Sequence, residues 1–327
     1  MRLAKYSIGV DIGGTNTAIG LVNSEGEVVS FETFSTPRKE DPTPANDYVS
    51  KIVETIKLLL ERHSVSPEGL TGIGIGAPNA NYYSGCMEYA VNFNPTWGKV
   101  PLKEWIEQQT GYRVVVTNDA NAAAYGEMIF GGAKGMRDFI MITLGTGVGS
   151  GIVVNGKLVY GHDGFAGEVG HVIIHPGGRV CGCGRKGCLE QYCSANGIKQ
   201  TYMELMDAEG KPYDKQLLET EGSRVVSREA EAGDSIARET YRIVGNTLGL
   251  ALANAVVYTS PEAIFLMGGP LKAGNLLLNP IIEAFERENL FVFNHRETGK
   301  PKARILKSKL NDNASAILGA AALTYEG

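Results

Sequence analysis

YSIGVDIGGT, residues 6–15, combines a short apolar run that ends in an acid with a turn built from two glycines. Residues 16–22 and 27–34 again have the composition of strands, and the polar turn NSEG at 23–26 joins them. Apolar runs bounded by glycine and polar turn residues are typical of β-strands. The sequence therefore predicts that the chain begins with three antiparallel strands.

The same pattern returns in the middle of the chain. A strand-like run, a Gly-rich turn, a second apolar run and a polar turn occupy residues 138–156. The corresponding positions are Asp11, Gly13, Leu21, Val22 and Asn23 in the first copy and Thr143, Gly145, Val153, Val154 and Asn155 in the second. Coincidence is one explanation, since such patterns are common. The equal spacing instead predicts two related lobes, each presenting a Gly-rich hairpin to a cleft between them.

Helices and further strands fill the rest of the chain. Apolar residues at helical spacing predict a helix at 47–62, and the alanine-rich run from 120 favours another. We also expect strands at 70–76, 112–117 and 263–267, and helices at 101–109, 196–260 (interrupted at 209–212) and 314–324. This pattern predicts an α/β chain with an N-terminal lobe at 1–117, a C-terminal lobe at 118–311, and a last helix (312–327) packed back on the N-terminal lobe.

Composition limits the class of protein. The 327 residues are enough for two lobes, and no apolar run approaches the roughly 20 residues of a membrane span. The first apolar stretch stops at Asp11, which is too early for a secretory signal, so a cytoplasmic protein is expected. The formal net charge is −5 without a long basic run, so neither nucleic acid nor a membrane is expected as a partner.

A histidine and three cysteines have the spacing of a metal site. His171 ends GEVGH at 167–171, and CGCGRKGCLE at 181–190 supplies Cys181, Cys183 and Cys188. Three thiolates and one imidazole complete a tetrahedral Zn²⁺ site with no open position, which indicates a structural zinc. A redox pair at Cys181 and Cys183, or a set of unligated thiols, is the alternative.

Three Gly-rich turns could approach a phosphorylated ligand. In DIGGT at 11–15, two glycines let backbone N–H groups and the Thr15 hydroxyl reach phosphate oxygens, and Asp11 could hold Mg²⁺ through water. TLGTGVG at 143–149 has the same character, and MGGP at 267–270 would let an adenine or ribose lie against the backbone. Each could equally be an ordinary turn after a strand. None has the P-loop pattern.

Acids and amides at element ends are candidates for binding a polyol. Asp119 stands between an expected strand and an expected helix, where it could cap the helix or act as general base for a sugar hydroxyl. Asn118 beside it could bind a neighbouring hydroxyl. Glu168 and Glu190 flank the cysteine segment and could accept bonds from further hydroxyls, although most glutamates are simply solvated.

Taken in order, these motifs resemble the ROK family of sugar kinases and repressors. The residues that carry the resemblance are DIGGT at 11–15, NDANAAAYGE at 118–127, LGTGVGSG at 144–151, GEVGH at 167–171 and CGCGRKGCLEQY at 181–192. The resemblance implies a two-lobed, actin-like and ribonuclease-H-like fold that binds ATP and Mg²⁺. The implied ATP-binding residues are Asp11, Gly13, Gly14, Thr15, Thr143, Gly145, Thr146, Gly147, Gly268 and Gly269.

The resemblance also implies a sugar site and an assembly. Asp119 would be the base that deprotonates the attacking hexose hydroxyl, and the expected assembly is a homodimer. The positions that match the family's sugar-binding residues are Asn118, Glu168, His171 and Glu190, together with Asn92 in NFNPTW, where the spacing to the tryptophan is longer than in the family.

Several activities remain open within this resemblance. A sugar-responsive repressor is disfavoured, because DIGGT begins at residue 11 and no helix-turn-helix domain precedes it. A sugar sensor without turnover is also disfavoured, because Asp119 and both phosphate turns are intact. Glucose is the expected substrate, by similarity to the glucokinases of the family. Fructose, mannose, N-acetylglucosamine and N-acetylmannosamine are the alternatives.

Overall fold

The structure is a computed structural model that describes residues 6–90, 93–310 and 314–326. By contacts, these residues divide into two compact units. The first unit takes the described residues of 1–136, 158–166 and 308–327, and the second takes 137–157 and 167–307. The sequence places residue 118 at the start of the C-terminal lobe, whereas the contacts keep residues 118–136 with the first unit.

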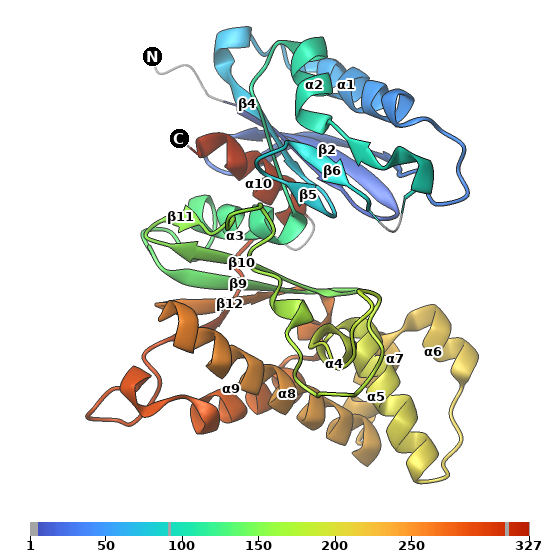
Figure 1. Ribbon diagram of the computed structural model, residues 1–327, viewed down its shortest axis with the longest axis vertical. Coiled ribbons are helices and arrows are strands. Elements are labelled where there is room, and N and C mark those ends of the chain that lie inside the picture. The colour runs from blue at the N-terminus through green and yellow to red at the C-terminus, as the bar shows by residue number, and fades with distance from the viewer. Residues whose placement is uncertain (1–5, 91–92, 311–313, 327) are drawn as a thin grey trace. The chain divides into compact units, whose positions relative to one another are not determined.

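The first unit is built on a five-stranded sheet in the order β3-β2-β1-β4-β8 (Figure 1). Strands β1 and β2 are antiparallel, as are β2 and β3, which confirms the antiparallel start predicted from the sequence. Strands β4 and β8 continue the sheet parallel to β1. The strand bounds are β1 Tyr6–Ile12, β2 Asn16–Asn23, β3 Val28–Ser35, β4 Leu70–Gly76 and β8 Val114–Thr117.

Helices bury the apolar residues of this sheet. They are α1 (Ala45–Arg62), α2 (Leu102–Thr110), α3 (Asp119–Ile129) and α10 (Ser315–Ala322). Helix α10 packs against β1 and β4, and a Cβ on Gly9 or Gly74 would collide with its carbonyl groups. Helix α3 packs on α10, where a Cβ on Gly126 would lie 2.7 Å from the Gly319 Cα. These close approaches explain why α3 belongs to the first unit.

The second unit repeats the sheet of the first. Its strand order is β11-β10-β9-β12-β13, in which β9 and β10 are antiparallel and β12 and β13 run parallel to β9. The matching order and directions confirm the predicted internal repeat. The strand bounds are β9 Phe139–Leu144, β10 Val148–Val154, β11 Lys157–Leu158, β12 Ala263–Met267 and β13 Arg304–Lys307.

Helices form most of the rest of the second unit (Figure 1). Their bounds are α4 Glu190–Cys193, α5 Ala195–Ala208, α6 Lys215–Glu221, α7 Ser223–Ala232, α8 Ser235–Thr259 and α9 Asn275–Glu288. The expected interruption at 209–212 is confirmed between α5 and α6. Gly245 and Gly249 let α8 and α9 approach closely, because a Cβ at either would meet the α9 backbone.

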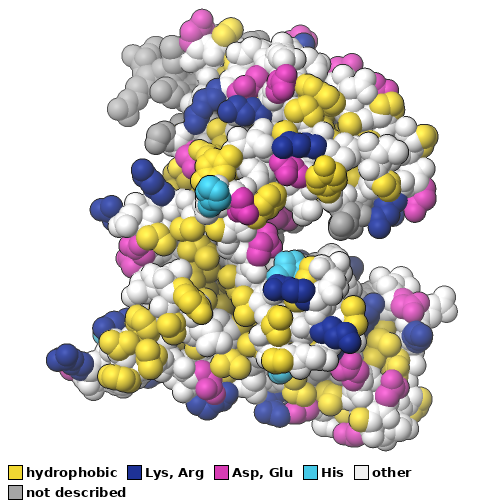
Figure 2. Space-filling model, in the orientation of Figure 1, with side chains coloured by type: hydrophobic (Ala, Val, Ile, Leu, Met, Phe, Trp, Pro, Cys, Tyr) yellow, Lys and Arg dark blue, Asp and Glu magenta, His cyan; other side chains and the backbone are white. Residues whose placement is uncertain are grey.

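Several elements were not predicted from the sequence, among them β13 and α4. A small sheet of β5 (Ala80–Asn81), β6 (Cys86–Glu88) and β7 (Lys99–Val100) occupies a region for which no strand was predicted. Helix α9 forms despite Pro280 inside it. Among the described helices, none is long and apolar enough to cross a membrane. On the face shown in Figure 2, basic side chains are scattered among acidic and apolar ones.

Candidate active site

In the first unit, the strand register brings two acids to one edge of the sheet. Asp11 is in register with Gly76 on β4, and Gly76 is in register with Thr117 on β8. Asp119 follows β8 directly, and a Cβ on Gly76 would lie 3.6 Å from its Cα. Because parallel strands end at the same edge, this end of the sheet gathers the side chains on which catalysis could depend.

Local hydrogen bonds separate the roles of Asn118 and Asp119. The Asn118 side chain caps α3 by accepting a bond of 2.7 Å from the Asn121 N–H. Asp119 is the first residue of the helix, and its Oδ1 accepts from the Ala120 N–H at 2.9 Å. The cap is therefore Asn118, and Asp119 is not needed for that purpose. The Asn118 amide nitrogen still has donors to offer a ligand.

The electrostatics of this edge favour proton binding. Asp119 is an exposed residue, but the protein atoms around its carboxylate still displace water from it and raise its pKa. Burial raises the pKa of Asp11 to about 7, and the charge of Asp119 adds to that rise. A carboxylate with a raised pKa is a better base near neutral pH, and two repelling acids make a suitable place for a cation.

An arginine that the sequence did not single out lies beside the DIGGT turn. The Gly13 N–H donates to the Asn16 carbonyl at 3.0 Å and closes the turn, and Gly14 and Thr15 are exposed at its tip. The Arg38 Nη2 lies 3.4 Å from the Thr15 Oγ1. Exposed backbone N–H groups beside a guanidinium are suited to phosphate oxygens. Only the fold shows this pairing, since 23 residues separate Thr15 from Arg38.

In the second unit, two Gly-rich turns lie side by side. The Gly145 N–H donates to the Gly147 carbonyl at 2.9 Å and forms the turn between β9 and β10. Gly268 follows β12, next to the end of β9, with a φ of 122°. A Cβ on Gly268 would collide with the Leu144 carbonyl, whereas Gly269 has open space around it. The fold thus brings together Thr143, Gly145, Thr146, Gly147, Gly268 and Gly269.

The predicted metal ligands converge. The ligand atoms of His171, Cys181, Cys183 and Cys188 all lie within 4.8 Å of one another. The Cys181 Sγ is 3.6 Å from the His171 Nδ1, and the Cys183 Sγ is 3.6 Å from the Cys188 Sγ. A backbone hydrogen bond from Arg185 lowers the pKa of Cys183, whereas burial raises the pKa of its neighbour Cys188, so Cys183 is the thiol of this pair that more readily forms the thiolate a metal binds.

The loops around these ligands also position the two glutamates. Glu168 precedes the short helix Val169–His171, which packs on β10 so closely that a Cβ on Gly170 would collide with the Val148 carbonyl. The Glu190 Oε2 accepts from the Val148 N–H at 3.1 Å. Glu190 therefore joins the cysteine segment to the Gly-rich turn at 144–149. The predicted sugar residue Asn92 lies outside the described residues.

Comparison with known proteins identifies relatives along the whole chain. The model of the ROK family matches residues 7–326. The chain is 38% identical over 293 residues to a glucokinase of Halalkalibacterium halodurans, covering 86% of each protein. It is 37% identical over 327 residues to a glucokinase of Streptomyces coelicolor, covering 98% of each.

A solved structure gives the same result. The ROK family glucokinase of Streptomyces griseus, crystallised with glucose and AMPPNP, superimposes with a TM-score of 0.76 at 33% identity. The match covers 98% of this chain and 100% of that one. The predicted fold class, an α/β chain of two lobes with the actin-like ATPase fold, is thereby confirmed.

Proposed function

Because the chain belongs to the ROK family, we propose that it is an ATP-dependent hexose kinase that converts glucose to glucose 6-phosphate. The observation that carries this proposal is Asp119, which follows β8 beside Asp11 with a raised pKa and leaves the helix cap to Asn118. Phosphoryl transfer needs a positioned base for the attacking hydroxyl, and this carboxylate supplies one.

The hexose is assigned to residues that present acceptors and donors for hydroxyl groups. Asp119 takes the proton of the attacking hydroxyl, and the Asn118 amide binds the neighbouring hydroxyl of the hexose. The remaining sugar-binding residues of the proposal are Glu168, His171, Glu190 and Asn92. Glucose is proposed first, because the relatives described above are glucokinases.

ATP is assigned to the Gly-rich turns. Gly13 closes the first turn, Gly14 and Thr15 offer N–H and hydroxyl donors at its tip, and Arg38 beside them adds a positive charge. The turns at 143–147 and 268–269 offer further backbone donors. Mg²⁺ fits near Asp11, because burial and the charge of Asp119 together raise the pKa of this acid, and a bound cation offsets both effects. When bound, Mg²⁺ neutralises charge on the phosphates.

Zinc is assigned to His171, Cys181, Cys183 and Cys188. Three thiolates and an imidazole form the donor set of a closed tetrahedral zinc site, and their mutual distances suit it. Such an ion stabilises the segment 171–188. Glu168 and Glu190 flank this segment. A cytoplasmic location, expected from the sequence, and a homodimer, implied by the family resemblance, complete the proposal.

The test is ADP release by the purified protein with Mg·ATP and a panel of five sugars. The panel contains glucose, fructose, mannose, N-acetylglucosamine and N-acetylmannosamine. We expect the highest kcat/KM with glucose. A higher kcat/KM with another sugar would make that sugar the preferred substrate and leave the kinase assignment unchanged. If no sugar releases ADP above the sugar-free rate, and calorimetry still detects sugar binding, the protein is a sensor.

A further inference from the structure

Helix α4 carries Glu190, and the core holds it on one side, where Cys193 and the N-cap residue Leu189 are fully buried. It is four residues long and begins without a side-chain cap. The hydrogen bonding of a single helical turn does not offset the entropy lost in forming it, so contacts with other elements must fix the position of α4. Its end carbonyls also need donors from elsewhere.

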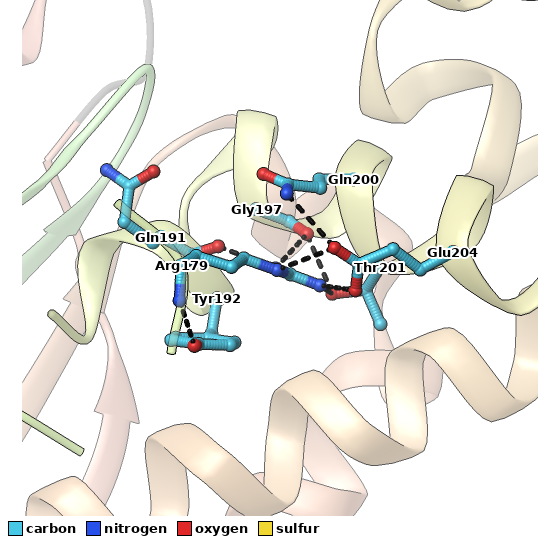
Figure 3. A network of polar contacts seen from close by, with 7 residues as sticks. All are labelled: Arg179, Gln191, Tyr192, Gly197, Gln200, Thr201 and Glu204. Carbon is cyan, nitrogen blue, oxygen red and sulfur yellow. Dashed lines mark hydrogen bonds and ion pairs between the residues drawn. The ribbon is translucent and has the colours of Figure 1, made fainter. Parts of the chain in front are cut away.

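Arg179 adds a set of polar contacts to this packing (Figure 3). Its Nη1 donates to the Gln191 carbonyl of α4 at 2.6 Å and lies 3.3 Å from the Gly197 carbonyl of α5. Its Nε and Nη2 bind the two carboxylate oxygens of Glu204 at 3.1 and 2.6 Å, and Nη2 also reaches Thr201 at 2.9 Å. One guanidinium therefore joins α4 to two turns of α5.

The backbone and ring contacts of Arg179 strengthen this connection. Its N–H donates to the Tyr192 hydroxyl at 2.9 Å, and its guanidinium carbon lies 4.6 Å from the Tyr192 ring centre. Only 11% of the Arg179 side chain is exposed, so solvent screens its bonds to the Gln191 and Gly197 carbonyls weakly, whereas the Glu204 side chain is 54% exposed. A planar fork with five donors can satisfy several fixed acceptors at once, which a lysine cannot.

Other side chains of α4 contact the Gly-rich turn at 144–149 and the cysteine cluster. The Glu190 Oε2 accepts from the Val148 N–H, and the Gln191 side-chain amide lies 3.5 Å from the Cys181 sulfur. Movement of α4 would therefore displace a carboxylate that borders the Gly-rich turn. A Cβ on Gly147 would collide with that carboxylate, so little space is available for another placement.

We propose that Arg179 is a positioning residue that fixes the Glu190 carboxylate by holding α4 against α5. Arg179 itself touches neither hexose nor nucleotide. The consequence for turnover rests on the proposed function, which assigns Glu190 to the hexose. Misplacing a substrate-binding group by about 1 Å can cost up to about 100-fold in rate constant, so the effect is measurable.

The test is the kinetics of Arg179→Met with glucose and Mg·ATP. We expect the KM for glucose to rise about 10-fold and kcat to stay within about 3-fold, because the lost interaction is one of binding. Arg242→Met is the matched control: Arg242 makes a two-pronged contact with Glu239 on α8, its side chain is 60% exposed, and it should behave like wild type.

A double variant separates positioning from general loosening. In a Glu190→Gln background, Arg179→Met should raise the KM no further, because both changes act through one carboxylate. Additive effects, or loss of zinc from Arg179→Met, would overturn the proposal in favour of a merely structural role. If Arg179→Met does not fold, Arg179→Lys and Glu204→Gln carry the same test with smaller shifts in the same direction.

Hydrogen exchange of the Val148 amide tests the proposal without turnover. Exchange should be about 10-fold faster in Arg179→Met than in Arg242→Met, since Val148 donates to Glu190. Equal exchange in the two variants would overturn the positioning role. If the wild type phosphorylates no hexose, the proposed function fails, and this measurement alone decides whether Arg179 positions Glu190.

Discussion

Asp11 and Asp119 share one edge of the sheet in the first unit, and the negative charge of Asp119 raises the pKa of Asp11 beyond the rise due to burial. Two acids far apart in the sequence are thus coupled electrostatically. A protein keeps such a pair at a cost in stability, which is typical of a site that binds a cation or moves a proton.

The raised pKa of Asp11 predicts how the stability of the fold depends on pH. The folded pKa of Asp11, about 7, lies above its ordinary value of 3.8, so its contribution is present below pH 3.8 and is lost as pH rises through about 7. Without added Mg²⁺, the Tm of Asp11→Asn relative to wild type should therefore increase from pH 5 to pH 8. Scanning calorimetry at the two pH values measures this. A constant difference would contradict the raised pKa of Asp11.

The pH dependence of kcat should report Asp119. A base must lose its proton before it can accept another, so kcat should rise with pH through the pKa of Asp119 in the ternary complex. Because the surrounding protein raises that pKa, the rise should lie above the ordinary aspartate value of about 4. A rate profile from pH 4.5 to 9 at saturating glucose and Mg·ATP tests this. A flat profile would exclude a titrating base in this range.

The metal site should couple zinc content to stability. Cys183→Ser removes one of four ligands, so zinc content should fall well below one ion per chain and the Tm should drop by roughly 5 °C or more. Cys86→Ser is the control, because Cys86 lies in the first unit, apart from these ligands. Metal analysis and calorimetry give both values. Equal zinc content in the two variants would disprove the ligand assignment.

Two adjacent glycines should differ in their tolerance of alanine. Gly268 has a φ of 122° and no room for a Cβ beside the Leu144 carbonyl, whereas Gly269 has open space. Gly268→Ala should therefore cost about 1–3 kcal/mol in the free energy of unfolding, and Gly269→Ala much less. Thermal unfolding of the pair measures the difference. Equal losses would mean that the β12 turn is not held as described.

Much of the fold could be predicted because its signals are local. The DIGGT hairpin, its repeat at residues 143–155 and the His and Cys spacing depend on residues close together in the sequence. The small sheet β5–β7 could not be predicted, because strands of two or three residues have no resolvable periodicity. Helix α9 was not predicted either, and it contains Pro280, a residue type that disfavours a helix interior.

The candidate site shows the same limit. Sequence reasoning named the glutamates and the aspartates but not the arginines Arg38 and Arg179. A surface arginine is the ordinary expectation, and only the fold brings Arg38 to Thr15 or Arg179 to Gln191. The sequence also left open whether Asp119 caps α3 or serves as a base. The hydrogen bond from Asn121 assigns the cap to Asn118.

The central claim is that this chain transfers phosphate to a hexose with Asp119 as the base. The most direct measurement is formation of sugar phosphate from glucose and Mg·ATP by wild type and Asp119→Asn, with Asp47→Asn, an exposed acid of α1, as control. We predict that wild type and Asp47→Asn form glucose 6-phosphate at similar rates, while Asp119→Asn, equally folded, is slower in kcat by roughly 10²–10⁴-fold. Near-normal turnover by Asp119→Asn would contradict the account.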